Sequence, residues 1–190
     1  MLFLNICTAW TNISVSIPAL WDTIEIMFPR HKSFDKVLDK WLQRARGRPL
    51  HISLEGAVDA DVAACIWQYS TSLRRLDISF EALPKYDKPH DLLGGNMPQA
   101  PLPCLQTLYI YGIFDVFCSW DPVLELLGLS PNLVDLSLRN TSFSDGDYVD
   151  KDLVLPNLRE LEYTGSSLDG GTLSWLSARI SKLSSFRQPF

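Results

Sequence analysis

One short pattern recurs along this chain and restricts what it can fold into. It consists of a leucine, two variable positions, a second aliphatic residue, one variable position and a third apolar residue, and we call it the repeat phrase. Alternation of apolar and variable positions predicts a strand with one buried face. A strand pattern that returns at intervals indicates a repeat architecture. The copies are Leu133–Leu138, Leu73–Ile78, Leu105–Ile110, Leu158–Tyr163 and the degenerate Ile52–Leu54.

The distance between copies is typical of leucine-rich units, which are about 20 to 29 residues long. Counted along Ile52, Leu76, Leu108, Leu136 and Leu161, the successive separations are 24, 32, 28 and 25 residues. The longest separation contains the segment 81–104, which is rich in proline and also holds two consecutive glycines. We expect this segment to form an insertion loop that cannot bury enough apolar surface to order itself.

Helical signals stand before and between the predicted strands. Apolar residues from Phe34 to Ala45 fall on one helical stripe. Asp59 is a candidate N-cap for a following helix, and Asp121 with Pro122 has the form of an N-cap followed by a first-turn proline. A last helix is expected over residues 173–180. Strands alternating with helices indicate an α/β fold with a parallel sheet.

These patterns divide the chain into three parts. Residues 1–30 form an apolar N-terminal segment, expected to be two short helices separated near Pro18, and residues 31–48 carry the connecting amphipathic helix. Residues 49–190 hold the repeats, with the insertion loop at 81–104. We therefore predict an irregular solenoid with the parallel sheet on its concave face and the helices on its convex face.

The repeats, over roughly Pro49 to Ser185, resemble the leucine-rich repeat family. The run Ile6-Cys7-Thr8-Ala9-Trp10-Thr11-Asn12-Ile13, followed by Ser16-Ile17-Pro18-Ala19-Leu20-Trp21, resembles the C-terminal half of an F-box. The whole arrangement is similar to fungal F-box proteins with degenerate repeats. Family members dock on a Skp adaptor of a cullin ubiquitin ligase through the F-box and hold a substrate with the repeats. The adaptor-binding residues that this resemblance implies are Trp10, Ile13, Pro18, Leu20 and Trp21.

Two departures qualify what the resemblance implies. The first half of an F-box, with its Leu-Pro-containing helix, has no room before Asn5, so we expect the docking motif to be incomplete. The asparagine or cysteine that the repeat family uses at its ninth position is replaced, for example by Thr141. A structural repeat fragment or truncated gene product that binds no adaptor is therefore the alternative interpretation.

Variable positions between the buried leucines should face away from the core and form rows across neighbouring strands. Tyrosine and arginine, which are enriched at interaction hot spots, occur among them. We expect this face to bind a protein partner, although an ordinary solvated sheet face is the alternative for any single residue. The predicted partner-binding residues are Arg75, Asp77, Tyr109, Tyr111, Asp135, Arg139 and Glu162.

Other classes of function find little support. The net charge of −5 gives no electrostatic reason to expect binding to nucleic acid or an anionic membrane. There is no apolar run of 18 residues and no export signal, so we expect an intracellular protein, cytoplasmic or nuclear. The acidic run Asp145–Asp150 lacks the glycine and glutamate of a calcium loop, and the three histidines and four cysteines show no metal-ligand spacing. We expect no catalytic residue, no metal and no cofactor.

Overall fold

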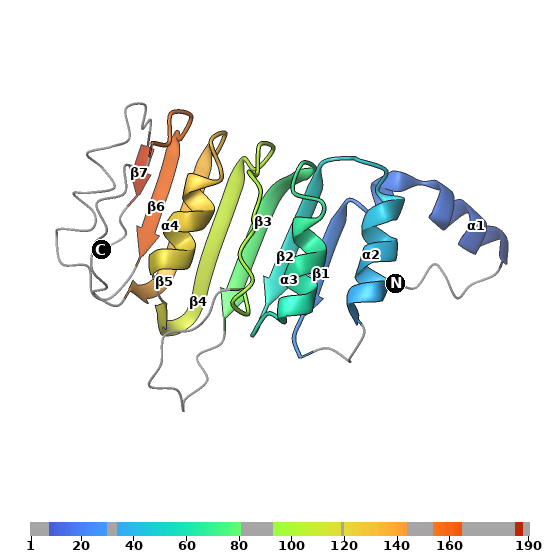
Figure 1. Ribbon diagram of the computed structural model, residues 1–190, viewed down its shortest axis with the longest axis horizontal. Helices are drawn as coiled ribbons and strands as arrows, with labels where there is room; N and C mark the ends of the chain where they lie inside the picture. The colour runs from blue at the N-terminus through green and yellow to red at the C-terminus, as the bar shows by residue number, and fades with distance from the viewer. Residues whose placement is uncertain are drawn as a thin grey trace.

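A parallel sheet is the main element of the structure. The computed structural model describes residues 8–29, 34–80, 93–118, 120–143, 154–164 and 185–187, and within them the chain is α/β. In the described part of the chain, seven strands form one sheet, every neighbouring pair is parallel, and the order of the strands in space is their order in the sequence (Figure 1). The strands are β1 (Thr23–Met27), β2 (Leu50–Glu55), β3 (Leu73–Phe80), β4 (Thr107–Cys118), β5 (Asp135–Phe143), β6 (Glu160–Thr164) and β7 (Ser185–Arg187).

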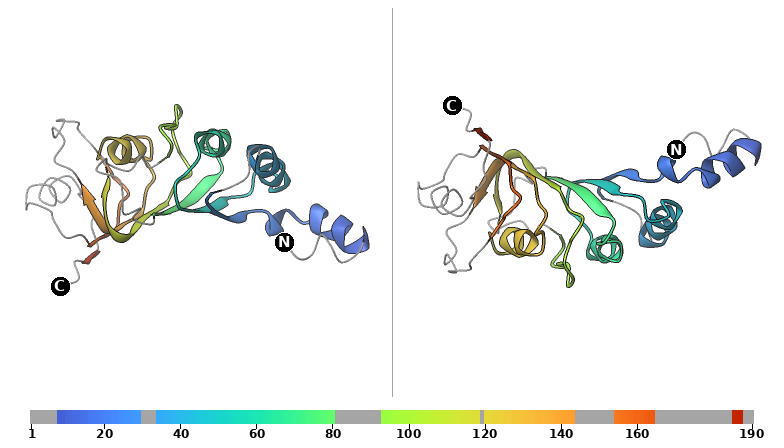
Figure 2. Two further views of the ribbon diagram at one scale, coloured as in Figure 1. Left: turned by 90° about the horizontal axis from the view of Figure 1, so that it is seen from below. Right: turned by 90° about the horizontal axis from the view of Figure 1, so that it is seen from above.

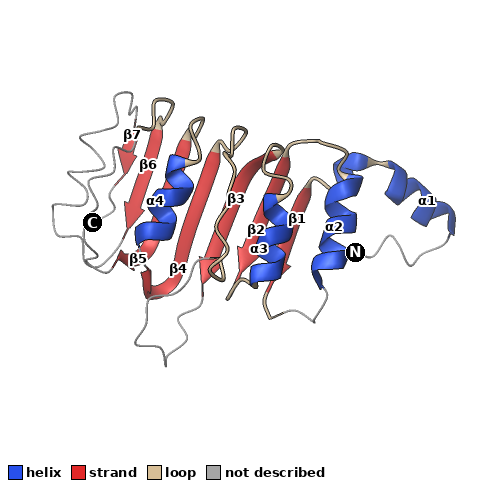
Figure 3. Ribbon diagram, in the orientation of Figure 1, coloured by secondary structure: helices blue, strands red, loops and turns tan. Residues whose placement is uncertain are grey.

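The helices divide the sheet into two unlike faces. Helices α2 (Phe34–Arg44), α3 (Ala60–Trp67) and α4 (Trp120–Gly128) lie on the same face, as both views of Figure 2 and the colouring of Figure 3 show. Helix α1 (Thr8–Ser16) extends beyond the β1 end of the sheet, and η2 (Pro18–Leu20) is a single 3₁₀ turn. We call the other side of the sheet the open face, because none of the described helices covers it. None of these helices combines the length and apolar character needed to cross a bilayer.

The repeat phrase accounts for the core. Its second aliphatic positions, Leu76, Leu108, Leu136 and Leu161, pair with one another in register across β3 to β6, and each is at most 2% exposed. The third apolar positions form a parallel row beside them. Burial of each such side chain contributes about 1.5–3 kcal/mol. The strands predicted from these copies are confirmed.

The expectation of two helices in the N-terminal segment is wrong for its second half. Thr23–Met27 is the edge strand β1, with Ile24 paired to Ile52 and Ile26 to Leu54. The stretch from Trp21 to Ile26 is in fact another copy of the repeat phrase, in which Trp21, 1% exposed, takes the place of the first leucine. The sheet therefore begins about one repeat earlier than the division at residue 49 implies.

Two of the predicted helix starts can be compared with the structure. The Asp59 side chain accepts a hydrogen bond from the backbone amide of Asp61 at 2.8 Å, which confirms it as the N-cap of α3. Helix α4 begins at Trp120, so Asp121 lies in its first turn and the prediction of an N-cap there is wrong. An acidic residue in the first turn still favours the helix through the positive end of its dipole.

The prediction that segment 81–104 cannot order itself is wrong for residues 93–104. Leu93 and Leu102 are 1% and 0% exposed. The Trp67 indole donates to the Asn96 carbonyl at 2.7 Å, and the Asn96 amide donates to the Ala60 carbonyl at 3.1 Å. Polar bonds to α3 thus supplement the two buried leucines. Residues 81–92 lie outside the described part of the chain, as do the predicted helix at 173–180, the acidic run at 145–150, His31 and His90.

Candidate functional site

The parallel register places the predicted partner-binding residues on three rows of the open face. Residues that alternate with the buried leucines must point to the opposite side of the sheet because the strands are pleated. The pairing of β2 to β6 matches these rows residue by residue. All seven residues are brought onto this face. The rows are His51, Arg75, Thr107, Asp135 and Glu160; then Ser53, Asp77, Tyr109, Ser137 and Glu162; then Glu55, Ser79, Tyr111, Arg139 and Thr164.

Four of these residues form one connected group, which we call the central cluster: Arg75, Asp77, Tyr109 and Asp135. The Arg75 guanidinium carbon lies 4.6 Å from the centroid of the Tyr109 ring, and Arg75 Nε lies 3.0 Å from both Asp77 carboxylate oxygens. The Tyr109 hydroxyl donates to Asp135 Oδ2 at 2.5 Å. Each side chain is therefore held by at least one other member before any partner arrives.

Burial and neighbouring charge change the acidity of this cluster. The pKa of Tyr109 is raised to about 12, first because its hydroxyl donates to Asp135, and further by burial and by the negative charge of that carboxylate. The pKa of Asp77 is also raised, because burial disfavours its charged form more than Arg75 favours it. Tyr109 consequently keeps its proton near neutral pH and serves as a hydrogen-bond donor, not as a base.

A second group, the Arg139 group, lies beside the cluster and comprises Tyr111, Ser137, Arg139 and Glu162. Arg139 Nη2 lies 2.5 Å from Glu162 Oε2, and Ser137 donates to the same oxygen at 3.3 Å. The bond to Glu162 raises the pKa of Arg139 above its ordinary value. Tyr111 is 39% exposed, so its ring is available at the surface. In the two groups together, the hydroxyls of Tyr109 and Ser137 each donate to a carboxylate, and the guanidinium groups of Arg75 and Arg139 each pair with one.

The residues implied by the F-box resemblance separate into buried and exposed sets. Trp21 is buried, its indole donates to the Ser14 carbonyl at 2.8 Å, and its ring lies under the Arg44 guanidinium. Trp21 therefore stabilises the fold and offers no docking surface. Ile13 and Leu20 are 49% and 46% exposed. Pro18 is half-buried, and the side chain of Trp10 lies outside the described residues.

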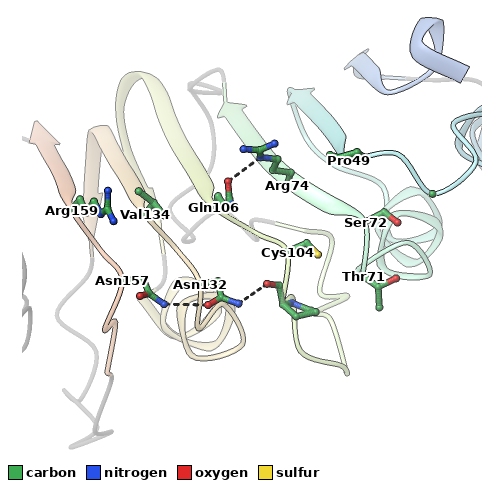
Figure 4. Close-up of a pocket in the computed structure, with 12 residues that line it drawn as sticks. Pro49, Thr71, Ser72, Arg74, Cys104, Gln106, Asn132, Val134, Asn157 and Arg159 are labelled. Atoms are coloured by element: carbon green, nitrogen blue, oxygen red, sulfur yellow. Dashed lines mark hydrogen bonds between the residues drawn. The ribbon is translucent and has the colours of Figure 1, made fainter.

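A groove that was not predicted from the sequence lies where the strands begin, and we call it the strand-start groove. It has a volume of about 520 Å³ (Figure 4). The signal was present in the sequence, since proline followed by asparagine precedes two copies of the repeat phrase, at Pro131-Asn132 and Pro156-Asn157. The groove is lined by Gly47, Pro49, Thr71, Ser72, Arg74, Pro103, Cys104, Gln106, Asn132, Val134, Asn157 and Arg159.

Hydrogen bonds between successive turns order one wall of this groove. The Asn132 amide donates to the Pro103 carbonyl at 2.8 Å, and the Asn157 amide donates to the Pro131 carbonyl at 3.2 Å and to Asn132 Oδ1 at 3.1 Å. Each asparagine thus ties its own turn to the preceding one. The proline-asparagine pairs therefore fix the spacing of the turns from which the strands start.

The described histidine, cysteine and acidic side chains are spread over the fold. No group of three or more of these described side chains is placed to hold a metal ion. Cys65 is a buried thiol whose pKa is raised to about 11 by burial and by the nearby Asp39 and Asp35. Cys104 is an exposed thiol on the groove.

Comparisons with protein-family models, with curated proteins and with solved structures find no match for this chain.

Proposed function

We propose that this chain is a non-enzymatic protein-interaction module, an irregular leucine-rich repeat solenoid whose open face binds another protein. One observation carries the proposal: in the central cluster, Arg75 is stacked on Tyr109 and the two are held by Asp77 and Asp135, on a sheet face that no described helix covers. Strand order that follows sequence order, with a period near that of leucine-rich units, supports the solenoid.

The geometry of the central cluster favours binding for a physical reason. Association is opposed by the ordering of long side chains, which costs about 0.5–1.5 kcal/mol for each one immobilised. Arg75 and Tyr109 are already fixed by their contacts, so a partner meets them with part of this cost removed. Tyrosine and arginine are also the residue types that most often dominate interface energies.

The same proposal includes a role in ubiquitin ligation, because the N-terminal segment resembles part of an F-box. Ile13, Ile17 and Leu20 are between 41% and 49% exposed, and they come from α1, the residue after it and η2. We propose that these residues contact a Skp adaptor while the open face holds a substrate of the ligase. The two surfaces use different residues, so they can be tested separately.

The substrate half is tested with a double substitution, Tyr109→Ala with Tyr111→Ala. Proteins captured from cells by the tagged wild-type chain and by the variant are compared by quantitative mass spectrometry, and each protein that the variant fails to capture is purified and titrated against both chains. We expect at least one purified protein to bind the wild type directly and to bind the double variant at least tenfold more weakly.

The control is a truncation to alanine on the helix-covered side of the sheet. Glu125 is exposed on α4, and Glu125→Ala should leave binding of the purified partner unchanged. The thermal unfolding midpoints of all three chains are measured alongside. The proposal is wrong if no protein is lost selectively from the double variant while that variant remains folded.

The adaptor half is tested with purified Skp adaptor and the substitutions Ile13→Asp and Leu20→Asp. Binding to the wild type and loss of binding in both variants would support adaptor docking. If the folded wild-type chain does not bind the adaptor, the open face alone remains as the proposed interaction surface.

A further inference from the structure

The strand-start groove carries a row of side chains at regular spacing. The backbone amide of Gln106 donates to the Arg74 carbonyl at 2.9 Å, that of Val134 to the Gln106 carbonyl at 2.8 Å, and that of Arg159 to the Val134 carbonyl at 2.8 Å. Each of these residues comes one position before a member of the open-face row that contains Arg75, Thr107, Asp135 and Glu160. Figure 4 shows the four in one row, with Asn132 and Asn157 in a second row below. An arginine therefore stands at each end, with neutral residues between.

The charge of the groove has one sign. Its lining contains the guanidinium groups of Arg74 and Arg159 and no carboxylate among the residues that the structure describes. Arg74 Nε donates to Gln106 Oε1 at 2.9 Å, which orients its guanidinium group, and its other donors have no partner among the described residues. Arginine is suited to bidentate binding of a carboxylate. The chain as a whole is acidic, with a net charge of −5, so this local positive row is a departure from its surroundings.

The amides of the groove suit a peptide backbone. Gln106 lies between the two arginines, and Asn132 and Asn157 line the groove from the second row. A side-chain amide has two N–H donors and an oxygen with two lone pairs, so the bonds described above leave each of the three with at least one donor or acceptor site. A peptide main chain presents the complementary pairs of groups at every residue. A groove lined with amides and ended by arginines is therefore suited to an extended segment with acidic side chains.

The strand spacing sets the separation of those acidic side chains. Arg74 precedes β3 and Arg159 precedes β6, three neighbouring-strand steps of about 4.8 Å each, so the two backbones lie about 14 Å apart. An extended peptide advances about 3.4 Å per residue, and residues separated by an even number point to the same side. Carboxylates four residues apart would reach both arginines together.

We propose that the strand-start groove binds an extended segment of a partner protein that carries acidic residues at positions i and i+4. This site is separate from the open face. It uses Arg74, Gln106 and Arg159, whereas the open face uses Arg75 and Tyr109, so the inference does not depend on the proposed function.

The test uses two fluorescein-labelled peptides of identical composition and the full chain. The first, Ser-Thr-Glu-Thr-Ser-Thr-Glu-Thr-Ser, has its glutamates four residues apart, and the second, Ser-Thr-Ser-Thr-Glu-Glu-Thr-Thr-Ser, has them adjacent. Fluorescence anisotropy at low ionic strength measures their affinities, because surface charge interactions are screened by salt. We expect the spaced peptide to bind about tenfold more tightly, the factor that corresponds to one charge-assisted hydrogen bond.

Variants connect the binding to the groove. Arg74→Gln should weaken the spaced peptide about tenfold and remove the preference between the two peptides. Arg74→Lys, which retains the charge without the planar fork, should give an intermediate affinity. Lys40→Gln removes one exposed positive charge from α2 and should have no effect. The double variant of Tyr109 and Tyr111 should bind the spaced peptide like the wild type.

Three results would overturn the inference. One is absence of binding of the spaced peptide to the folded wild-type chain. Another is equal affinity for the two peptides, or equal weakening by Lys40→Gln, since either means general charge attraction. The third is an oligothymidylate of similar length that binds and excludes the peptide, which would make the groove a nucleic-acid site. Circular dichroism of each variant confirms that the chain remains folded.

Discussion

Arg74 and Arg75 are consecutive residues, yet they belong to two surfaces of different character. Arg75 is neutralised by Asp77 and stacked on Tyr109 in the central cluster, whereas Arg74 stands in a groove whose described lining includes no carboxylate. The repeat phrase has two adjacent variable positions, and the first serves the strand-start groove while the second serves the open face. One repeated sequence therefore builds two surfaces that can change independently.

The largest loss of stability is expected from truncating a buried leucine in the core row, because the strands that carry both surfaces pack on it. Leu108 is 0% exposed and lies between Leu76 and Leu136 in the core row. Leu108→Ala should lower the free energy of unfolding by about 2–5 kcal/mol, because it removes buried apolar atoms and leaves a cavity. Chemical denaturation measures the change. Leu20→Ala, at a position 46% exposed, is the control and should change the free energy by less than about 0.5 kcal/mol.

A smaller loss of stability is expected from removing an asparagine of the strand-start groove. Asn132→Ala removes the bond to the Pro103 carbonyl and the acceptor used by Asn157, and it should cost about 1 kcal/mol in the free energy of unfolding. Binding on the open face should be unaffected. Thr71→Ala, on the same groove, is the control because the Thr71 side chain makes no hydrogen bond to any residue that the structure describes. Equal unfolding curves for wild type and Asn132→Ala would show that the asparagine bonds contribute nothing.

A comparable but pH-dependent effect is expected in the central cluster. Tyr109→Phe keeps the ring beneath Arg75 and removes the hydroxyl that donates to Asp135, so it should lower the free energy of unfolding by about 1 kcal/mol at neutral pH. Denaturant titration measures the difference. A loss greater than that of Leu108→Ala would contradict this ranking.

The pH dependence follows from the raised pKa of Tyr109. Folding raises this pKa from 10.0 to about 12, so the folded state holds the proton more tightly than the unfolded chain does. The stabilisation is therefore complete below about pH 10 and is lost as the pH rises through 12. The difference between wild type and Tyr109→Phe should shrink over this interval. The pKa of Tyr69 is also raised to about 12, but Tyr69 is present in both chains, so its contribution cancels in the difference between them.

The smallest effect is expected in the Arg139 group. Arg139 and Glu162 form an ion pair whose side chains are 52% and 25% exposed. Such pairs contribute about 0.2–1 kcal/mol because water and ions screen them. Arg139→Gln should thus cost at most about 1 kcal/mol, and 1 M salt should remove most of the difference. A cost that persists in high salt would mean that Arg139 acts through packing.

The sequence allowed the rows of the open face to be predicted because strand alternation has a fixed period. Once Leu76 and Leu108 are aligned, Asp77 and Tyr109 must be neighbours, and the register agrees. The contacts within the cluster were not predictable in the same way. The stacking of Arg75 on Tyr109 depends on side-chain rotamers, which a pattern of residue types does not determine.

The errors have physical causes of their own. Strand β1 was missed because Trp21 fills the position of a leucine, and a tryptophan within an apolar run fits a helix equally well. The order of residues 93–104 was missed because it depends partly on bonds to α3. Gly94 shows how close that contact is: it has a φ of +59°, and a Cβ there would lie 2.8 Å from the Ala60 nitrogen. Composition alone does not reveal such a fit.

The order of the strands has a consequence for folding and for change over evolution. Each pairing joins two strands that are consecutive in the sequence, so the loop that must close for it is about one repeat long, whatever the length of the whole sheet. Folding rates fall as contacts become more distant in sequence, so adding a unit should slow the formation of the existing pairings little. Duplication or loss of a unit is therefore a change that this architecture can tolerate, and each added unit would lengthen the open face and the groove by one strand.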